Sequence, residues 1–337
     1  MTEAELEDLL SEPTPELVAS LFRTEGDIIV LGVAGKMGPS LARLAVRASR
    51  DASTPRRVFG VARFTGPGPR EYLESHGVET IACDLLDQRA VAELPSAPHV
   101  IYMAGRKFGT LGDEAATWAT NAHLPGVVAQ RFAASNIVAF STGNVYPLAP
   151  VNGAGPSEDD PVGPIGEYAQ AALARERIFE FFSRRNGTRM AILRLNYAIE
   201  PRYGVLRDIA DKVNAGVQVD VAMGYANVIW QRDANAIALR ALEHCASPPL
   251  VLNVTGKPAQ SVRELALAFG SRLGRESVVL GVEGATALLS DASRCEQLFG
   301  APPTGIDRMI DLVADWVAAG GRSLQLPTHF EEREGRF

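Results

Sequence analysis

The chain has 337 residues, of which 46% are hydrophobic and 22% are charged, as in a globular protein with a large buried core. A net charge of −7 excludes a chain-wide basic surface for nucleic acid, and no apolar run approaches the roughly 20 residues of a membrane-spanning helix. The three cysteines are widely spaced, and no Cys/His cluster has metal-ligand spacing. We therefore expect a cytoplasmic protein with small-molecule partners and no metal, membrane or nucleic-acid partner.

The predicted elements change in character along the chain. Residues 1–25 are acidic and interrupted by prolines, and we expect a helical arm of one or two short helices. Residues 26–195 alternate short β-branched runs with amphipathic helical patterns, which predicts an α/β fold of the Rossmann type with a doubly wound parallel sheet. The pattern of residues 196–337 is less regular. We expect a smaller C-terminal lobe there, with segments near 228–258 returning to the first domain.

A glycine-rich turn separates the first predicted strand from the helix that follows it. Gly32, Gly35 and Gly38 lie in this turn, and Lys36 and Met37 fall between the last two glycines. Because glycine has no side chain, such a turn lets the backbone approach a pyrophosphate closely. The N-terminus of the following helix then stabilises the negative charge of the pyrophosphate. Because the turn opens an alternating strand and helix pattern, we predict a dinucleotide-binding site rather than a tight turn alone.

The residues that follow the second and third predicted strands help to distinguish an NAD site from an NADP site. Arg63 follows Ala62 where an acidic residue would accept hydrogen bonds from the ribose of NAD, and a guanidinium group suits the 2′-phosphate of NADP. We therefore favour NADP over NAD, although Arg63 could also be a solvated surface residue. Asp84 and Leu85 follow the third strand, where an acid could contact the adenine amino group. The alternative for Asp84 is a turn or helix cap.

The motifs GVAGKMG, CDL, IYMAG, FSTGNVY and GEYAQ follow one another in this order, with a helix that contains Asn121 before FSTGNVY. In this order and at these intervals, residues 27–275 resemble the extended short-chain dehydrogenase/reductase family of nucleotide-sugar epimerases and dehydratases. The resemblance implies NAD(P) held by the glycine turn and a substrate held under the C-terminal lobe. It also implies an oxidoreductase or epimerase of carbohydrate metabolism that acts on a sugar-like hydroxyl or carbonyl group by reversible hydride transfer.

The resemblance also assigns roles to residues. Thr142 corresponds to the Ser/Thr that hydrogen-bonds the substrate oxygen, and Tyr168 corresponds to the acid/base Tyr. Asn121 could bridge the backbone to active-site water or brace its helix. The predicted cofactor-binding residues are Gly32, Gly35, Lys36, Met37, Gly38, Arg63, Asp84, Leu85, Ala104, Gly105, Lys107, Asn121 and Tyr168. The predicted substrate-binding residues are Thr142, Asn144, Asn196 and Tyr197.

One catalytic position departs from the family pattern. The motif YxxxK reads Tyr168-Ala-Gln-Ala-Ala172, so the ammonium group that would lower the pKa of the Tyr is absent. Losing such a neighbouring charge raises a Tyr pKa by about 1–3 units, which makes Tyr168 a poor base at neutral pH. A neutral phenol still has the proton that carbonyl reduction requires. Arg175 lies seven residues after Tyr168, near the same helix face. It could have a catalytic role, but we favour a surface or dimer contact.

The residues after Thr142 narrow the predicted reaction. Relatives that eliminate water or carbon dioxide have acidic residues where this chain has Gly143 and Asn144. Neither residue exchanges a proton, which favours oxidation, reduction or epimerisation. The missing Lys leaves an alternative open, a non-catalytic NAD(P)-binding sensor or assembly protein. An apolar face over residues 178–182 permits a homodimer, and a core-facing helix would explain the same pattern.

Overall fold

A seven-stranded parallel sheet forms the centre of the computed structural model, which describes residues 1–107, 112–326 and 328–336. The strand order is β12-β7-β5-β4-β1-β2-β3, and every neighbouring pair is parallel. The strands are β1 (Ile28–Leu31), β2 (Val58–Ala62), β3 (Glu79–Ala82), β4 (His99–Tyr102), β5 (Asn136–Thr142), β7 (Met190–Leu195) and β12 (Leu250–Val254). The predicted Rossmann-type fold is confirmed.

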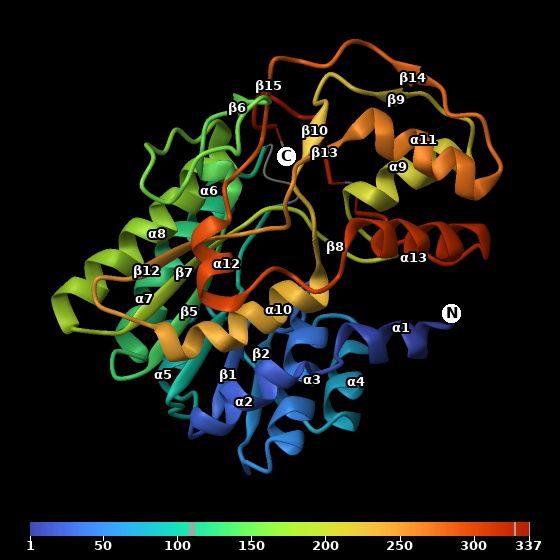
Figure 1. Cartoon of the computed structure of the whole chain (residues 1–337). Coiled ribbons are helices and arrows are strands. Elements are labelled where there is room, and N and C mark those ends of the chain that lie inside the picture. The colour runs from blue at the N-terminus through green and yellow to red at the C-terminus, as the bar shows by residue number, and fades with distance from the viewer. Residues whose placement is uncertain (108–111, 327, 337) are drawn as a thin grey trace.

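Both faces of the sheet are covered by helices, as the apolar character of the strands requires. Alternate residues of β1 face opposite sides: Ile28 and Val30 pack into one hydrophobic core, and Ile29 and Leu31 pack into the other. The first core contains α2 (Pro15–Arg23), α3 (Gly38–Asp51) and α10 (Gln231–Arg240). The second contains α5 (Gln88–Ala92), α7 (Leu124–Arg131) and α8 (Gly166–Asn186), and Figure 1 shows the two layers.

A smaller lobe lies beside the sheet (Figure 1). Its core is built by α9 (Val205–Asn214), α11 (Val262–Leu273) and α13 (Ile306–Ala318), which pack against one another. Phe330 from the C-terminal tail is buried in this lobe core. Two short strand pairs border the lobe, β9 (Val219–Asp220) with β14 (Val279–Leu280) and β10 (Tyr225–Ala226) with β13 (Gln260–Ser261).

The N-terminal arm connects the two cores. Its helices are α1 (Glu3–Leu10), capped by Thr2, and α2, capped by Thr14. Leu6 and Leu10 of α1 are buried in the lobe core, whereas Leu17 and Leu21 of α2 are buried against the sheet. The arm is therefore part of the folded structure and helps to fix the lobe relative to the sheet.

The remaining described elements are short. They are α4 (Pro69–Ser75), α6 (Glu114–Trp118), the π-helical turn η1 (Ala119–His123), η2 (Gly143–Val145), β6 (Ala149–Pro150), β8 (Ala198–Ile199), β11 (Ile229–Trp230), η3 (Ala241–His244), β15 (Thr286–Ala287) and α12 (Ser293–Phe299). Among the described residues, no helix has both the length and the apolar character needed to cross a membrane.

Candidate active site

The carboxyl ends of four neighbouring strands meet at one edge of the sheet, where ligands bind in folds of this type. The glycine turn follows β1, Ala104 and Lys107 follow β4, Thr142 ends β5, and Asn196 follows β7. A cavity of about 130 Å³ opens between this edge and the lobe. It is lined by Lys36, Met37, Lys107, Ser141, Thr142, Asn144, Tyr168, Leu195, Asn196, Tyr197, Ala198, Tyr203, Gly204 and Thr328.

The cavity brings together the predicted catalytic and substrate residues with part of the predicted cofactor set. Thr142, Asn144, Tyr168, Asn196 and Tyr197 all line it. Tyr203 and Thr328 were not predicted, because they come from the lobe and the C-terminal tail, and no local motif marks them. They reach the cavity only through the packing of the lobe against the sheet.

The glycine turn has the tight geometry that a dinucleotide cradle requires. Gly32 has a φ of +88°, and a Cβ there would lie 2.7 Å from the backbone nitrogen of Ala104. A Cβ on Gly38 would lie 2.2 Å from the carbonyl oxygen of Val33. Helix α3 begins at Gly38, and its N-cap residue Met37 makes no side-chain capping bond, which leaves the end of the helix that favours a phosphate uncapped by that residue. These residues fit the pyrophosphate of NAD(P).

The residues predicted near the adenosine half lie at the ends of β2 and β3. Arg63 is exposed, which is compatible with either dinucleotide, so the preference for NADP stays a prediction. Asp84 is also exposed, and its Oδ1 accepts a hydrogen bond from the Leu86 backbone at 3.0 Å. This is the turn role that the sequence offered as one alternative, and the helix that follows is capped by Asp87 instead. Leu85 is buried beside it.

Asn121 is fully buried in the π-helical turn η1 and braces the segment after β4. Its Oδ1 accepts a hydrogen bond from the Arg106 backbone at 2.8 Å, and its Nδ2 donates to the Arg106 carbonyl at 2.8 Å. The same Oδ1 accepts a hydrogen bond from Arg175 Nη2 at 2.7 Å. Asn121 thus links its helical turn to the segment after β4 and to α8.

The expectation that Arg175 makes a surface or dimer contact is wrong. The residue is only 6% exposed, and its Nη1 donates to the Phe140 carbonyl on β5 at 2.8 Å. Its position seven residues after Tyr168, two turns along one helix, carried the signal for this inward orientation. The error came from treating a charged residue on a long helix as solvent-exposed by default.

Tyr168 and Thr142 form the centre of the site. Tyr168 is partly buried and lies beside Thr142 in the lining of the cavity. Burial raises the pKa of Tyr168, while the Arg175 charge and the Thr142 hydroxyl oppose that rise. Thr142 Oγ1 also lies 3.3 Å from Asn144 Oδ1 and accepts a hydrogen bond from the Asn144 backbone at 3.2 Å. A substrate oxygen beside this pair would meet two hydroxyl groups.

Gly143 is closely packed beneath Asn196. A Cβ on Gly143 would lie 2.2 Å from Asn196 Oδ1, and the Asn196 amide nitrogen lies 3.2 Å from Ser290 Oγ. Any side chain at position 143 would therefore displace a buried, hydrogen-bonded residue. The local packing agrees with the sequence argument against an acidic group beside Thr142.

Two lysines face the cavity from different segments. Lys36 Nζ donates to the Ala198 carbonyl at 3.0 Å and lies 3.7 Å from the centre of the Tyr203 ring. Lys107 Nζ donates to the Thr328 carbonyl at 3.2 Å. Burial lowers the pKa of Lys36, and it lowers the pKa of Lys107 to about 8. Both ammonium groups would be stabilised by an anion in the cavity.

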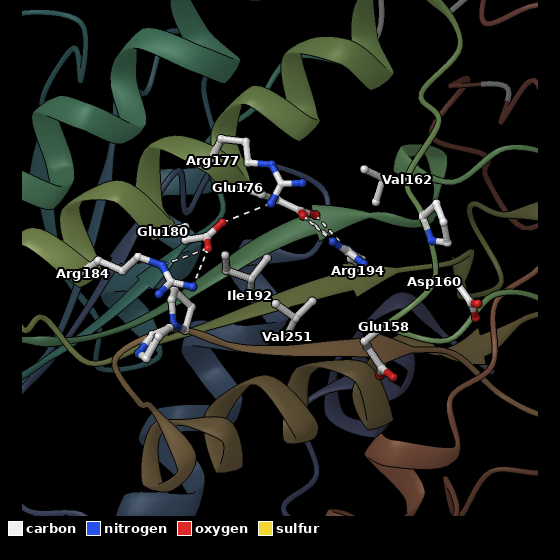
Figure 2. A pocket seen from close by; sticks show the side chains of 13 residues that line it. Glu158, Asp160, Val162, Glu176, Arg177, Glu180, Arg184, Ile192, Arg194 and Val251 are labelled. Carbon is white, nitrogen blue, oxygen red and sulfur yellow. Dashed lines mark hydrogen bonds and ion pairs between the residues drawn. The ribbon is translucent and has the colours of Figure 1, made fainter.

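A second hollow, of about 270 Å³, lies on the outer side of α8, β7 and β12 and contains none of the predicted site residues (Figure 2). Each arginine of its lining pairs with a glutamate of the same lining. Glu180 is bound by Arg177 at 3.1 Å and by Arg184 at 2.9 Å, and Glu176 is bound by Arg194 at 2.8 Å. Because these pairs satisfy their own charges, this hollow is a weaker candidate for catalysis than the first cavity. Among the described residues, no His, Cys, Asp and Glu cluster could hold a metal ion.

A family model for the NAD dependent epimerase/dehydratase family matches residues 28–253. The chain belongs to this family, which confirms the predicted resemblance to the extended short-chain dehydrogenases/reductases and places the protein in a class of NAD-dependent enzymes. None of the curated protein sequences matches the chain.

Solved structures of similar fold include several sugar epimerases. A Thermus thermophilus UDP-glucose 4-epimerase in complex with NAD is 20% identical with a TM-score of 0.69, covering 86% of this chain and 98% of that chain. A Bacillus cereus UDP-glucuronic acid 4-epimerase in complex with NAD is 17% identical with a TM-score of 0.71, covering 87% and 99%. A Thermotoga maritima UDP-glucose 4-epimerase with UDP-glucose is 18% identical with a TM-score of 0.70, covering 87% and 99%. These similarities confirm the fold.

The lowered pKa of Lys107 predicts a specific pH dependence of stability. Lys107 loses its proton near pH 8 in the folded protein but near pH 10.4 when unfolded, so the unfolded chain binds more protons between these values. The free energy of unfolding should therefore gain a positive contribution as pH rises from 8 to 10, by at most about 1.4 kcal/mol per pH unit. Urea unfolding should show a smaller slope in Lys107→Met than in the wild type, because Lys36, whose pKa is also lowered by burial, still contributes in the variant.

Lys257→Met is the matched control for that measurement. Partial burial lowers the pKa of Lys257, but hydrogen bonds to Glu296 and Asp291 outweigh burial and raise it overall. Lys257 therefore stays protonated over this range. The control should keep the wild-type slope. An identical slope in Lys107→Met and the wild type would contradict the assignment.

Proposed function

We propose that this protein is an NAD(P)-dependent oxidoreductase or epimerase that acts on a hydroxyl or carbonyl group of a sugar or sugar-like substrate. The observation that carries the proposal is that Tyr168 and Thr142 line the same cavity, together with Lys36 and Met37 of the glycine turn. When bound, NAD(P) supplies the capacity to take up and return hydride. Substrate names of the similar structures, UDP-glucose and UDP-glucuronic acid, support a sugar as the substrate class.

The chain's own residues handle the proton and the substrate oxygen. The Thr142 hydroxyl holds that oxygen, with Asn144 fixing the Thr142 rotamer through its backbone N–H. Tyr168 gives a proton to the oxygen when a carbonyl is reduced and takes it back when a hydroxyl is oxidised. Epimerisation needs both steps in turn at the same carbon. Gly143 leaves no acid beside Thr142, which favours this chemistry over dehydration or decarboxylation.

The proposed cofactor cradle consists of the glycine turn with Lys36 and Met37, and Ala104, Gly105 and Lys107 after β4. Asn121 holds the segment after β4 in place. Asp84 and Leu85 border the adenosine end, and Asn196 and Tyr197 complete the substrate side. Arg63 supports NADP, whereas the family supports NAD as the cofactor class.

Ala172 supports a second candidate function, a non-catalytic NAD(P) sensor or assembly protein located, like the proposed enzyme, in the cytoplasm. A sensor needs the cofactor cradle but no acid/base Tyr. The retention of Thr142 and Tyr168 together in the cavity lining favours the enzyme. Hydride transfer that depends on Tyr168 would exclude the sensor.

Tyr168→Phe should abolish most hydride transfer while preserving cofactor binding. Removing a positioned acid/base group reduces the rate by about 10²–10⁴-fold. The measurement is single-turnover oxidation of NADPH or NADH with a panel of sugars and keto-sugars. Tyr225→Phe, in the lobe, is the matched control and should retain the wild-type rate. Unchanged turnover in Tyr168→Phe would refute the assigned mechanism.

Arg63→Ala should weaken NADPH binding and leave NADH binding unchanged. A charged hydrogen bond to the 2′-phosphate contributes about 1.5–3 kcal/mol, or about 10–150-fold in affinity. Fluorescence titration of the full, cofactor-stripped chain measures both ligands. Arg70→Ala, which removes an exposed Arg paired with Glu74, is the control. Equal effects on both ligands, or no effect, would favour NAD.

We further propose that the protein is a homodimer formed through α7 and α8. Phe179 is buried in the core, but Phe181 on the same helix is 53% exposed. Sedimentation of the wild type should give a dimer at micromolar concentration, and Phe181→Glu should give a monomer. Phe22→Glu, on the exposed side of α2, should stay dimeric. A wild-type monomer at that concentration would rule out this interface.

A further inference from the structure

Arg175 occupies an unusual position on α8, a helix of 21 residues. Tyr168, Ala172 and Arg175 lie along one side of this helix, because residues three, four and seven apart share a face. Helical side chains lean toward the helix N-terminus, so the long Arg175 side chain extends toward the turn that contains Ala172. Ala172 is fully buried and packs in a small cluster with Val145 and Tyr146.

The guanidinium group of Arg175 is lodged between the carboxyl ends of β4 and β5. On the β5 side, Nη1 donates to the Phe140 carbonyl at 2.8 Å. On the β4 side, a Cβ on Gly105 would lie 2.7 Å from Nη2, so this glycine lets the strand end approach the charge. Asn121 Oδ1 holds Nη2 at 2.7 Å. The charge is therefore fixed on three sides at the edge where the cavity opens.

The charge of Arg175 is satisfied by neutral partners. Within the described part of the chain, its hydrogen bonds go to a carbonyl and an amide oxygen, and no carboxylate forms an ion pair with it. The neighbouring Glu176 is bound by Arg194 instead, at 2.8 Å. A buried charge that no carboxylate cancels acts on the nearest ionisable groups.

We propose that Arg175 is a positioning residue that replaces the absent ammonium group at position 172 and stabilises the phenolate form of Tyr168. This inference rests on the proposed function only in taking Tyr168 as the acid/base group. It agrees with the direction of the Arg175 effect, which lowers the pKa of Tyr168 against the rise caused by burial. Because a guanidinium stays charged at any pH at which the protein folds, the effect persists across the working range.

Other ionisable groups also face Tyr168 across the cavity. They are Lys36 from the glycine turn, Lys107 after β4, and Tyr197 and Tyr203 after β7, with Glu200 and Asp208 behind them. A substitution of Arg175 leaves the identity of all of these residues unchanged. The difference between variants therefore isolates the contribution of Arg175.

The test measures the pKa of the group at position 168 directly. Incorporating 3,5-difluorotyrosine at position 168 of the full chain makes the phenol more acidic, which brings its ionisation into the range where proteins fold, and gives a single ¹⁹F signal. Arg175→Gln should raise this pKa by about one unit or more. Arg175→Lys, which keeps the charge, should restore most of the wild-type value. Arg177→Gln removes an exposed Arg from the same helix and should leave the pKa unchanged.

An unchanged pKa in a folded Arg175→Gln variant would overturn the proposal. If that variant does not fold, Asn121→Asp provides the second test, because it places a carboxylate 2.7 Å from Nη2, although it also removes the hydrogen bond that Nδ2 donates to the Arg106 carbonyl. It should raise the pKa at position 168, and an unchanged value would again overturn the proposal. The titration needs no substrate, so its result is independent of whether the protein transfers hydride.

Turnover, once measured, provides a further readout. The proton-transfer limb of the kcat/KM profile should move to higher pH in Arg175→Gln and return in Arg175→Lys. A merely structural role would lower the rate at all pH values without moving this limb.

Discussion

The parallel register of the seven-stranded sheet is the constraint on which the site depends. Because neighbouring strands run in the same direction, the segments after β1, β4, β5 and β7 all emerge at one edge. Gly32, Gly105, Thr142 and Asn196 are far apart in the sequence, yet this register brings them to the same cavity region. Helices on both faces then bury the strands and keep the edge rigid.

Two adjacent residues of α8 handle buried charge in opposite ways. Glu176 accepts hydrogen bonds from Ser141 at 2.5 Å and from Arg194 at 2.8 Å, so its charge is cancelled beneath the sheet edge. Arg175, one residue earlier, is held by a carbonyl oxygen and an amide oxygen, so no opposite charge cancels its positive charge. This separation of the two charges explains how one helix can both anchor the sheet and act on Tyr168.

The sequence predicted what local motifs encode. The strand and helix alternation, the glycine turn and the pair Thr142 and Tyr168 each follow from residues close together in the chain, and the structure places the turn and the pair at one edge. Tyr203 and Thr328 depend on how the lobe and the tail pack, which no local pattern reports. Arg175 had a readable helical spacing, but its inward orientation depended on Asn121, from a separate helical segment.

The lobe contributes charge balance as well as shape. The negative charge of Glu200 favours the protonated form of Lys36 and so raises its pKa against the effect of burial. Glu200 pairs with Arg202 at 3.0 Å, and Arg202 also binds Glu7 of the N-terminal arm at 2.6 Å. Lys107 is held by the tail carbonyl of Thr328. The described residues that line the cavity include these two lysines and no acid. An anionic ligand there would restore the solvation that both ammonium groups lose on burial, so ligand binding and lobe docking should stabilise each other.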